Sequence, residues 1–257
     1  MDELRIEQRG SARWLTLNRP KRRNALSRGL VRALYDAVVT AASDDCRCLV
    51  LAGTGPVFCA GADLNEFREA SDPAVLASDG DMLARLLEAL STSPKPVIAR
   101  VHGAALGGGV GLVAAADFAI GASDSRFTLS EVRLGLIPAV VGPYILRALG
   151  RRNTQAFMLS STAIDAAEAH RLDLLYDVVD PEALDTTVDS LVANLSEAAP
   201  GALADVKQLV SSIEGLSLSS AREVTIRALA DRRMSDEGQE GMAAFLEKRK
   251  PAWTQVR

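Results

Sequence analysis

The sequence predicts an α/β protein with a largely parallel sheet, followed by a helical C-terminal region. Through the first two-thirds of the 257 residues, short apolar runs alternate with amphipathic stretches, which is the pattern of strands joined by helices. After Val178 and Val179 the strand signal stops, and apolar residues recur at helical spacing only. With 48% hydrophobic and 24% charged residues, the chain is long and apolar enough to bury a sizeable core.

Four short apolar runs predict the strands, because each is bounded by turn-prone residues or by glycine. They are residues 14–17, 48–52, 96–101 and 118–120. Stretches between and beside them predict helices. One helix begins after Ser27, whose hydroxyl is a good N-cap, and others cover residues 82–90 and 112–116.

The last third of the chain predicts helices alone. Apolar residues repeat at helical spacing in residues 184–195, 204–213 and 221–234, and a final stretch ends near Lys248. Apolar faces on successive helices need something to pack against, either a core of their own or a second subunit. We therefore divide the chain into a strand-and-helix core and a helical region. The core is residues 1–195, and the helical region is residues 196–257.

The composition argues against several classes of partner and site. A formal net charge of −4 and an aromatic content of 4% argue against nucleic acid or an anionic membrane as the main partner. The cysteines Cys46, Cys48 and Cys59 and the two histidines lack metal-ligand spacing, so we expect no metal and a reducing compartment. The charged start MDELRIEQRG and the lack of a long apolar run predict a cytoplasmic location.

Two glycine-bearing segments are candidates for binding a ligand oxygen. Gly107, Gly108 and Gly109 stand in a row before a helix, where main-chain N–H groups can approach a ligand closely. Tight packing of helix on strand is the alternative explanation. The second segment is FCAGADL at 58–64, and its alternative is a surface loop closed by Asp63 as a helix N-cap. Neither segment matches a P-loop or a dinucleotide-binding fingerprint.

One carboxylate, Glu131, is the candidate acid or base. It stands among apolar residues in FTLSEVRLGLIP at 127–138, where burial would raise its pKa towards the range of a working acid or base. The alternative is a surface carboxylate paired with Arg133 or Arg126.

Three other residues with reactive side chains are interpreted as structural. His102 stands beside the glycine segment, and Asp117 follows a run of alanines and is expected to anchor a loop. Cys59 has no evident base or cation nearby in the sequence, so a nucleophilic role is not expected.

These segments stand in the order and spacing of a known family. The matching stretches are NRP at 18–20, RNAL at 23–26, FCAGADL at 58–64, VHGAALGGGVGL at 101–112, SEVRLGLIP at 130–138 and FLEKRKPAW at 245–253. On these motifs, which extend over nearly the whole chain, the sequence resembles the crotonase (enoyl-CoA hydratase/isomerase) family. The resemblance implies a core made of a spiral of ββα turns. It also implies that the helical C-terminal part assembles a homotrimer or a dimer of trimers.

The resemblance further implies an acyl-CoA thioester substrate, gripped at its carbonyl. The peptide N–H groups of Ala62 and Gly108 match the family's oxyanion-hole donors, and Glu131 matches its second catalytic glutamate. Coenzyme A is part of the substrate, so no separate cofactor is expected. The family's CoA-binding positions correspond here to Lys21, Arg22, Asn24, Ala25, Leu26, Ala60, Asp63, Phe245 and Lys248. The last two stand on the C-terminal helix, of this subunit or of a neighbour.

One departure from the family pattern leaves the reaction open. Where two-glutamate hydratases carry their first glutamate, this chain has Gly111, so no water can be held between two carboxylates at these positions. Hydration of a 2-enoyl-CoA is preferred, because IPAVVGPY at 137–144 resembles methylglutaconyl-CoA hydratases, and Arg133 is available in sequence for a second substrate carboxylate. Isomerisation of a 3-enoyl-CoA to a 2-enoyl-CoA, which needs one carboxylate, is the alternative. An acyl-CoA-binding protein with little turnover is the second alternative.

Overall fold

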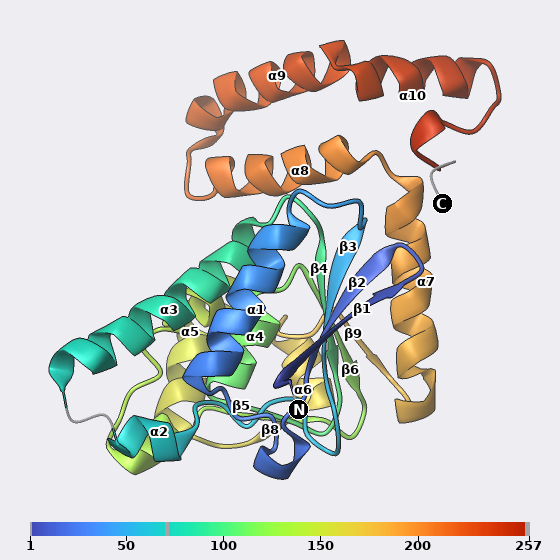
Figure 1. The fold of residues 1–257 in the computed structure, drawn as a ribbon. Coiled ribbons are helices and arrows are strands. Elements are labelled where there is room, and N and C mark those ends of the chain that lie inside the picture. The colour runs from blue at the N-terminus through green and yellow to red at the C-terminus, as the bar shows by residue number, and fades with distance from the viewer. Residues whose placement is uncertain (1, 70–71, 255–257) are drawn as a thin grey trace.

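A six-stranded sheet forms the centre of the fold (Figure 1). The computed structural model describes residues 2–69 and 72–254, and its strands follow the order β1-β2-β3-β4-β6-β9. Their bounds are β1 Leu4–Arg9, β2 Ala12–Leu17, β3 Cys48–Gly53, β4 Val97–Val101, β6 Phe118–Ala122 and β9 Asp177–Val179. Neighbouring strands run parallel, except that β1 is antiparallel to β2. The predicted α/β class with a largely parallel sheet is confirmed.

A second, three-stranded sheet positions the chemistry-bearing segments. In it β5 (Ala104–Leu106) runs parallel to β7 (Arg126–Thr128), which pairs with the antiparallel β8 (Ile164–Asp165). β5 leads directly into the three glycines, and β7 leads into the turn that carries Glu131. The small sheet therefore brings these two segments together.

Helices cover both faces of the large sheet (Figure 1). α1, α3, α4 and α5 pack on one face and α7 packs on the other. The helices are α1 Arg28–Ala41, α2 Leu64–Glu69, α3 Pro73–Thr92, α4 Gly108–Ala115, α5 Gly142–Ser160, α6 Ala166–Arg171, α7 Leu184–Glu197, α8 Pro200–Ile213, α9 Leu218–Met234 and α10 Asp236–Leu246. As predicted, the Ser27 hydroxyl caps α1, accepting a hydrogen bond from the Leu30 amide at 3.1 Å, a contact that typically stabilises a helix by about 1 kcal/mol.

The helices α8, α9 and α10 extend beyond the layered core (Figure 1). α8 is fastened to the core by Lys207, whose ammonium lies 2.5 Å from the Asp117 carboxylate. Asp117 also accepts the Val97 amide at 2.7 Å, so it anchors the loop before β6 to the start of β4, in line with the predicted loop-anchoring role. The expected boundary at residue 195 falls in the last turn of α7. In the described part of the chain, no helix has the length and apolar character needed to cross a membrane.

Candidate active site

The two glycine-bearing segments, residues 58–64 and residues 104–109, lie side by side. The Cys59 amide donates to the Ala104 carbonyl at 3.1 Å, and the Leu106 amide donates back to the Cys59 carbonyl at 2.9 Å. This short ladder continues on one strand into Gly61 and Ala62, and on the other into Gly107 and Gly108. The two amides singled out from the sequence therefore belong to adjoining turns.

The direction of the Ala62 amide is set by the carbonyl in the same peptide unit. The Gly61 carbonyl accepts a hydrogen bond from the Leu26 amide at 2.7 Å. In a trans peptide the C=O and N–H bonds point in opposite directions, so the Ala62 N–H points away from Leu26. Within residues 2–69 and 72–254 this amide donates to no protein group, and Ala62 is exposed. The Ala62 N–H is available to a ligand.

The Gly108 amide is oriented in the same way by the start of α4. The Gly107 carbonyl accepts from the Val110 amide at 3.0 Å and from the Gly111 amide at 3.2 Å. The Gly108 N–H therefore points out of the N-terminal end of α4, where the helix dipole favours negative charge. Among the residues described, no group accepts a hydrogen bond from it.

Glycine is required where the two turns meet. Gly61 and Gly107 have φ angles of +82° and +48°, which side chains rarely adopt. A Cβ on Gly61 would lie 2.8 Å from the Leu106 carbonyl oxygen and 3.4 Å from the Gly108 nitrogen. A Cβ on Gly108 would lie 2.9 Å from Leu26 Cδ1. A side chain at either position would push the two turns apart.

Glu131 lies beside these turns, and one of its two carboxylate oxygens has no hydrogen-bond partner. It opens the 3₁₀ turn Glu131–Leu134, and its Oε1 lies 2.7 Å from where a Gly107 Cβ would be. Its Oε2 is buried and has no hydrogen-bond partner. Burial raises the pKa of the Glu131 carboxyl above 4.5. The alternative of an ion pair with Arg133 or Arg126 is wrong, because none forms with Glu131 in the described chain.

A valine occupies the space that a second carboxylate would need. Gly111 is buried in α4, and a Cβ added there would lie 2.3 Å from Val141 Cγ1 and 3.6 Å from Leu87 Cδ1. Val141 is itself buried. The position that would carry a second glutamate is therefore occupied by apolar side chains.

Several residues predicted to bind CoA line the approach to the Ala62 turn. Lys21 and Arg22 are exposed in the 3₁₀ turn Pro20–Arg22. Leu26 pairs with Ala62 in an isolated β-bridge, and Ala25 and Ala60 are half-buried beside it. Ala60 is tied to the same segment, since its amide donates to the Arg23 carbonyl at 3.0 Å.

Two of the predicted CoA contacts have side chains committed elsewhere. Asn24 is fully buried, and its amide group donates to the carbonyls of Thr54 and Val57 at 2.8 and 2.7 Å. Asp63 is also buried, with one carboxylate oxygen accepting the Asn65 amide at 3.2 Å and the other 2.9 Å from Arg19. Both side chains are committed to protein partners, so any contact of Asn24 or Asp63 with CoA would be made by the main chain, and their place along the CoA site stays a prediction. Asp63 instead precedes α2 as the helix-capping residue considered from the sequence.

The predicted C-terminal contacts do not reach the site within one chain. Phe245 is 83% exposed at the end of α10, and Lys248 follows it with a positive φ. Figure 1 places α10 at the far end of the molecule from α2 and β5, which flank the glycine turns. Within one chain these two residues therefore lie far from the glycine turns.

His102 and Cys59 are structural, in agreement with the sequence interpretation. The His102 ring contacts the Gly55 carbonyl at 2.7 Å and the Arg100 guanidinium at 3.0 Å, so both ring nitrogens are engaged. Burial and Arg100 lower the pKa of His102. It lines a polar hollow of about 370 Å³ on the α7 side of the sheet. Burial raises the pKa of the Cys59 thiol to about 12, which leaves it unreactive.

Arg19 is a member of the site region that the sequence interpretation missed. Its guanidinium contacts Asp63 at 2.9 Å and Glu3 at 2.7 Å, and donates to the Ala25 carbonyl at 2.5 Å. The NRP motif marked the position, but no local pattern indicated the ion pair with Asp63, more than 40 residues away.

Comparison with known proteins identifies the family of the chain. The model of the enoyl-CoA hydratase/isomerase family matches residues 7–256. The chain belongs to this family. It is 35% identical over 249 residues to 1,2-epoxyphenylacetyl-CoA isomerase of Escherichia coli, across 93% of this chain and 94% of that protein. It is 31% identical to 2,3-dehydroadipyl-CoA hydratase of the same organism, across 98% of both.

The crotonase fold expected from the motifs is confirmed by solved structures. An enoyl-CoA hydratase from Shewanella pealeana superposes with a TM-score of 0.94 at 36% identity, over 98% of this chain and 96% of the other. The family contains proteins named as hydratases and as isomerases. The relatives of this chain are therefore enzymes named for reactions on acyl-CoA thioesters. Family membership alone does not distinguish hydration from isomerisation.

Proposed function

We propose that this protein adds water reversibly across the double bond of a 2-enoyl-CoA thioester. The observation that carries the proposal is the buried, unpartnered Glu131 oxygen beside a turn whose Gly108 amide is also unpartnered. A buried carboxylate left without a partner is costly, and a raised pKa suits a group that takes up and releases a proton. Several relatives are named enoyl-CoA hydratases, which supports the choice of reaction.

The proposed reaction moves charge onto the thioester oxygen. Glu131 takes a proton from water as the hydroxide adds to C3, and the electrons of the double bond move onto the carbonyl oxygen. The Ala62 and Gly108 amides stabilise this enolate. Removing one such donor typically lowers kcat by about 10²–10³-fold. Glu131 then returns the proton to C2, so that water has been added and the carboxylate is restored.

In the proposed complex, CoA binds along residues 21–26. Lys21 and Arg22 are exposed and suit the CoA phosphates. Phe245 and Lys248 would complete the site of a neighbouring subunit, so we propose a homotrimer or a dimer of trimers. The cytoplasm remains the location that the sequence favours.

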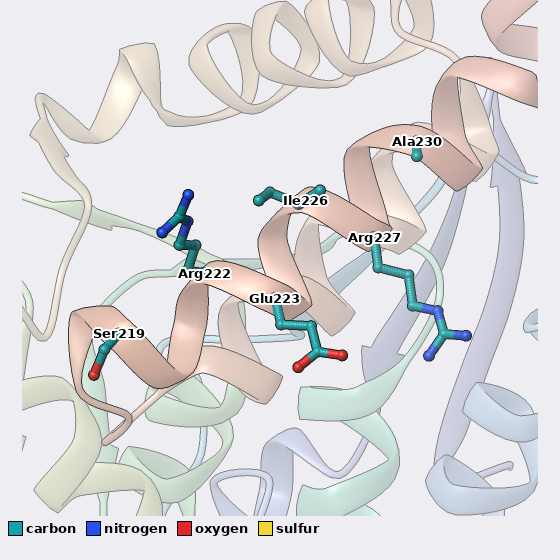
Figure 2. Close-up of a pocket in the computed structure, with 6 residues that line it drawn as sticks. All are labelled: Ser219, Arg222, Glu223, Ile226, Arg227 and Ala230. Atoms are coloured by element: carbon teal, nitrogen blue, oxygen red, sulfur yellow. The ribbon is translucent and has the colours of Figure 1, made fainter.

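Exposed apolar side chains on the C-terminal helices support this assembly. Leu218, Leu229, Met234 and Phe245 are each more than two-thirds exposed, an unusual density for a surface in water. Figure 2 shows six side chains of α9, among them Ile226, which is 59% exposed. These side chains line an open hollow of about 380 Å³. Light scattering that returns a monomer would contradict the assembly.

Isomerisation is a second candidate, favoured by one specific observation. Val141 fills the position beside Gly111 where a second carboxylate would lie. Moving a proton from C2 to C4 of a 3-enoyl-CoA needs one carboxylate only, and the same two amides would hold the enolate.

Two substrates separate the candidate functions. Hydration predicts that crotonyl-CoA loses the absorbance of its conjugated thioester, whereas isomerisation predicts that 3-hexenoyl-CoA gains it. Glu131→Gln is expected to abolish either reaction while keeping the affinity for the CoA ester within a few-fold. If both mixtures stay unchanged although the esters bind, the protein is an acyl-CoA-binding protein, and the hydratase proposal fails.

A further inference from the structure

One guanidinium joins three segments of the chain around the Ala62 turn. Arg19 follows β2, and its side chain is only 14% exposed. Its Nε lies 2.7 Å from Glu3, one terminal nitrogen lies 2.9 Å from Asp63, and the other donates to the Ala25 carbonyl at 2.5 Å. The planar fork of an arginine can satisfy three acceptors in fixed directions.

The contacts of Arg19 bracket the peptide that carries the Ala62 N–H. The Leu26 amide donates to the Gly61 carbonyl at 2.7 Å, and the Asp63 amide donates to the Leu26 carbonyl at 3.0 Å. Arg19 holds the Ala25 carbonyl in the peptide unit that supplies the Leu26 amide, and it also holds the Asp63 side chain. Both edges of the Ala62 turn are therefore fixed to the same guanidinium.

The third contact ties this unit to the start of α1. Glu3 accepts the Ser27 hydroxyl at 2.5 Å as well as Arg19, and Ser27 caps α1. A rotation of the Ala62 peptide would therefore have to break contacts to Leu26 and Asp63 and disturb a buried ion pair. In a site this crowded, a small tilt of an N–H changes its alignment to a developing oxyanion, and with it the stabilisation of that charge.

We propose that Arg19 is the positioning residue of the Ala62 oxyanion donor. This inference rests on the proposed function, because it requires that Ala62 binds a thioester carbonyl. Arg19 contacts no substrate in this scheme; it acts through Ala25 and Asp63. Its loss should weaken polarisation of the carbonyl more than it weakens the grip on CoA.

The test measures the absorbance of a bound thioester. A merely structural role of Arg19 would not change this absorbance while leaving the affinity for CoA intact. Cinnamoyl-CoA absorbs at longer wavelength when its carbonyl is polarised, so the shift on binding reports the donors directly. In Arg19→Lys, which keeps the charge but not the fork, we expect the shift to fall by at least half. We expect kcat to fall by about 10–100-fold, part of the effect of losing one donor outright. Affinity for a CoA thioether, which has no carbonyl, should stay within about twofold of the wild type.

Matched variants make every outcome decisive. Arg13→Lys alters an ion pair to Asp44 of similar length, 2.9 Å, away from the turn, and should keep the full shift. Asp63→Asn removes the charge that faces Arg19 and should reproduce the loss if Arg19→Lys fails to fold. A wild-type shift in both Arg19→Lys and Asp63→Asn overturns this inference alone. No shift in the wild type overturns the proposed function and the inference together.

Discussion

Replacing Gly111 by alanine is expected to destabilise the protein, although alanine favours helices. A Cβ at this position would lie 2.3 Å from Val141 Cγ1 and 3.0 Å from Val141 Cβ. Overpacking a buried site costs about 1–3 kcal/mol, whereas Gly→Ala in a helix gains roughly 0.5–1 kcal/mol. We expect a net loss of about 1–2 kcal/mol, which lowers Tm by roughly 2–8 °C in a chain of this size.

A second substitution shows whether that contact is the cause. Val141→Ala removes Cγ1 and should cost about 2 kcal/mol by itself, through lost apolar burial and a small cavity. In that background Gly111→Ala should cost nothing or stabilise, because the remaining 3.0 Å contact relaxes by a few tenths of an ångström. The resulting coupling energy is expected to be about 1–3 kcal/mol.

The assay is thermal and urea unfolding of the wild type, both single variants and the double variant, followed by circular dichroism. Gly80→Ala is the matched control, since it lies inside α3 and its Cβ would meet only Val140 Cγ2, at 3.9 Å. This control should raise the stability by about 0.5–1 kcal/mol. A Gly111→Ala variant as stable as the wild type, or a cycle without coupling, would refute the packing argument.

Three further predictions concern titratable groups. Glu131→Gln should raise Tm by about 1–4 °C at pH 7, from roughly 0.5–1 kcal/mol for a half-exposed carboxylate without a partner. The folded-state pKa of Glu131 is raised, so the wild type becomes more stable relative to Glu131→Gln as the pH falls through that pKa. The difference in Tm between the two proteins should therefore vanish at lower pH. A difference in Tm that stays constant with pH would contradict this prediction. The acid limb of kcat/KM should lie above pH 4.5, the ordinary Glu value, and a limb at or below it would remove Glu131 as the base. Burial raises the pKa of Cys46 to about 11 and that of Cys48 to about 12, so an aromatic disulfide reagent should find no reactive thiol in the native protein.

Local signals predicted the central strands β2, β3, β4 and β6 and most of the helices, but not α2, α5 or α6. Ser27 was predicted as a cap, and Asp63 was considered as one in the alternative explanation of its segment, because capping depends on residues within one turn. β1 carried no usable pattern, since it is an edge strand in which only Leu4 is buried. α5 is interrupted at Gly150, where φ is +69°, so its apolar residues do not keep one helical period. Both elements depend on tertiary packing.

The parts of the site that depend on neighbours in sequence could be predicted, and those that depend on contacts distant in sequence could not. Glu131 was identified because apolar neighbours in sequence imply burial. Its pairing with an arginine was a wrong alternative, because the turn beginning at Glu131 places the carboxylate against Gly107. The commitment of Asn24 to the carbonyls of Thr54 and Val57 spans about 30 residues, and nothing in the local sequence encodes it.

The thioester-binding groups inferred here belong to the main chain, and this limits how the protein can change. Apart from proline, no substitution at Ala62 or Gly108 deletes the peptide N–H, and the carbonyls of the same peptide units, those of Gly61 and Gly107, are anchored by hydrogen bonds. Divergence is thereby confined to the walls facing the acyl group, such as Glu131 and the Gly111–Val141 pair. The main-chain amides that polarise the carbonyl can thus be kept while the side chains that transfer protons change. This suits a family whose members are named for several reactions on CoA esters.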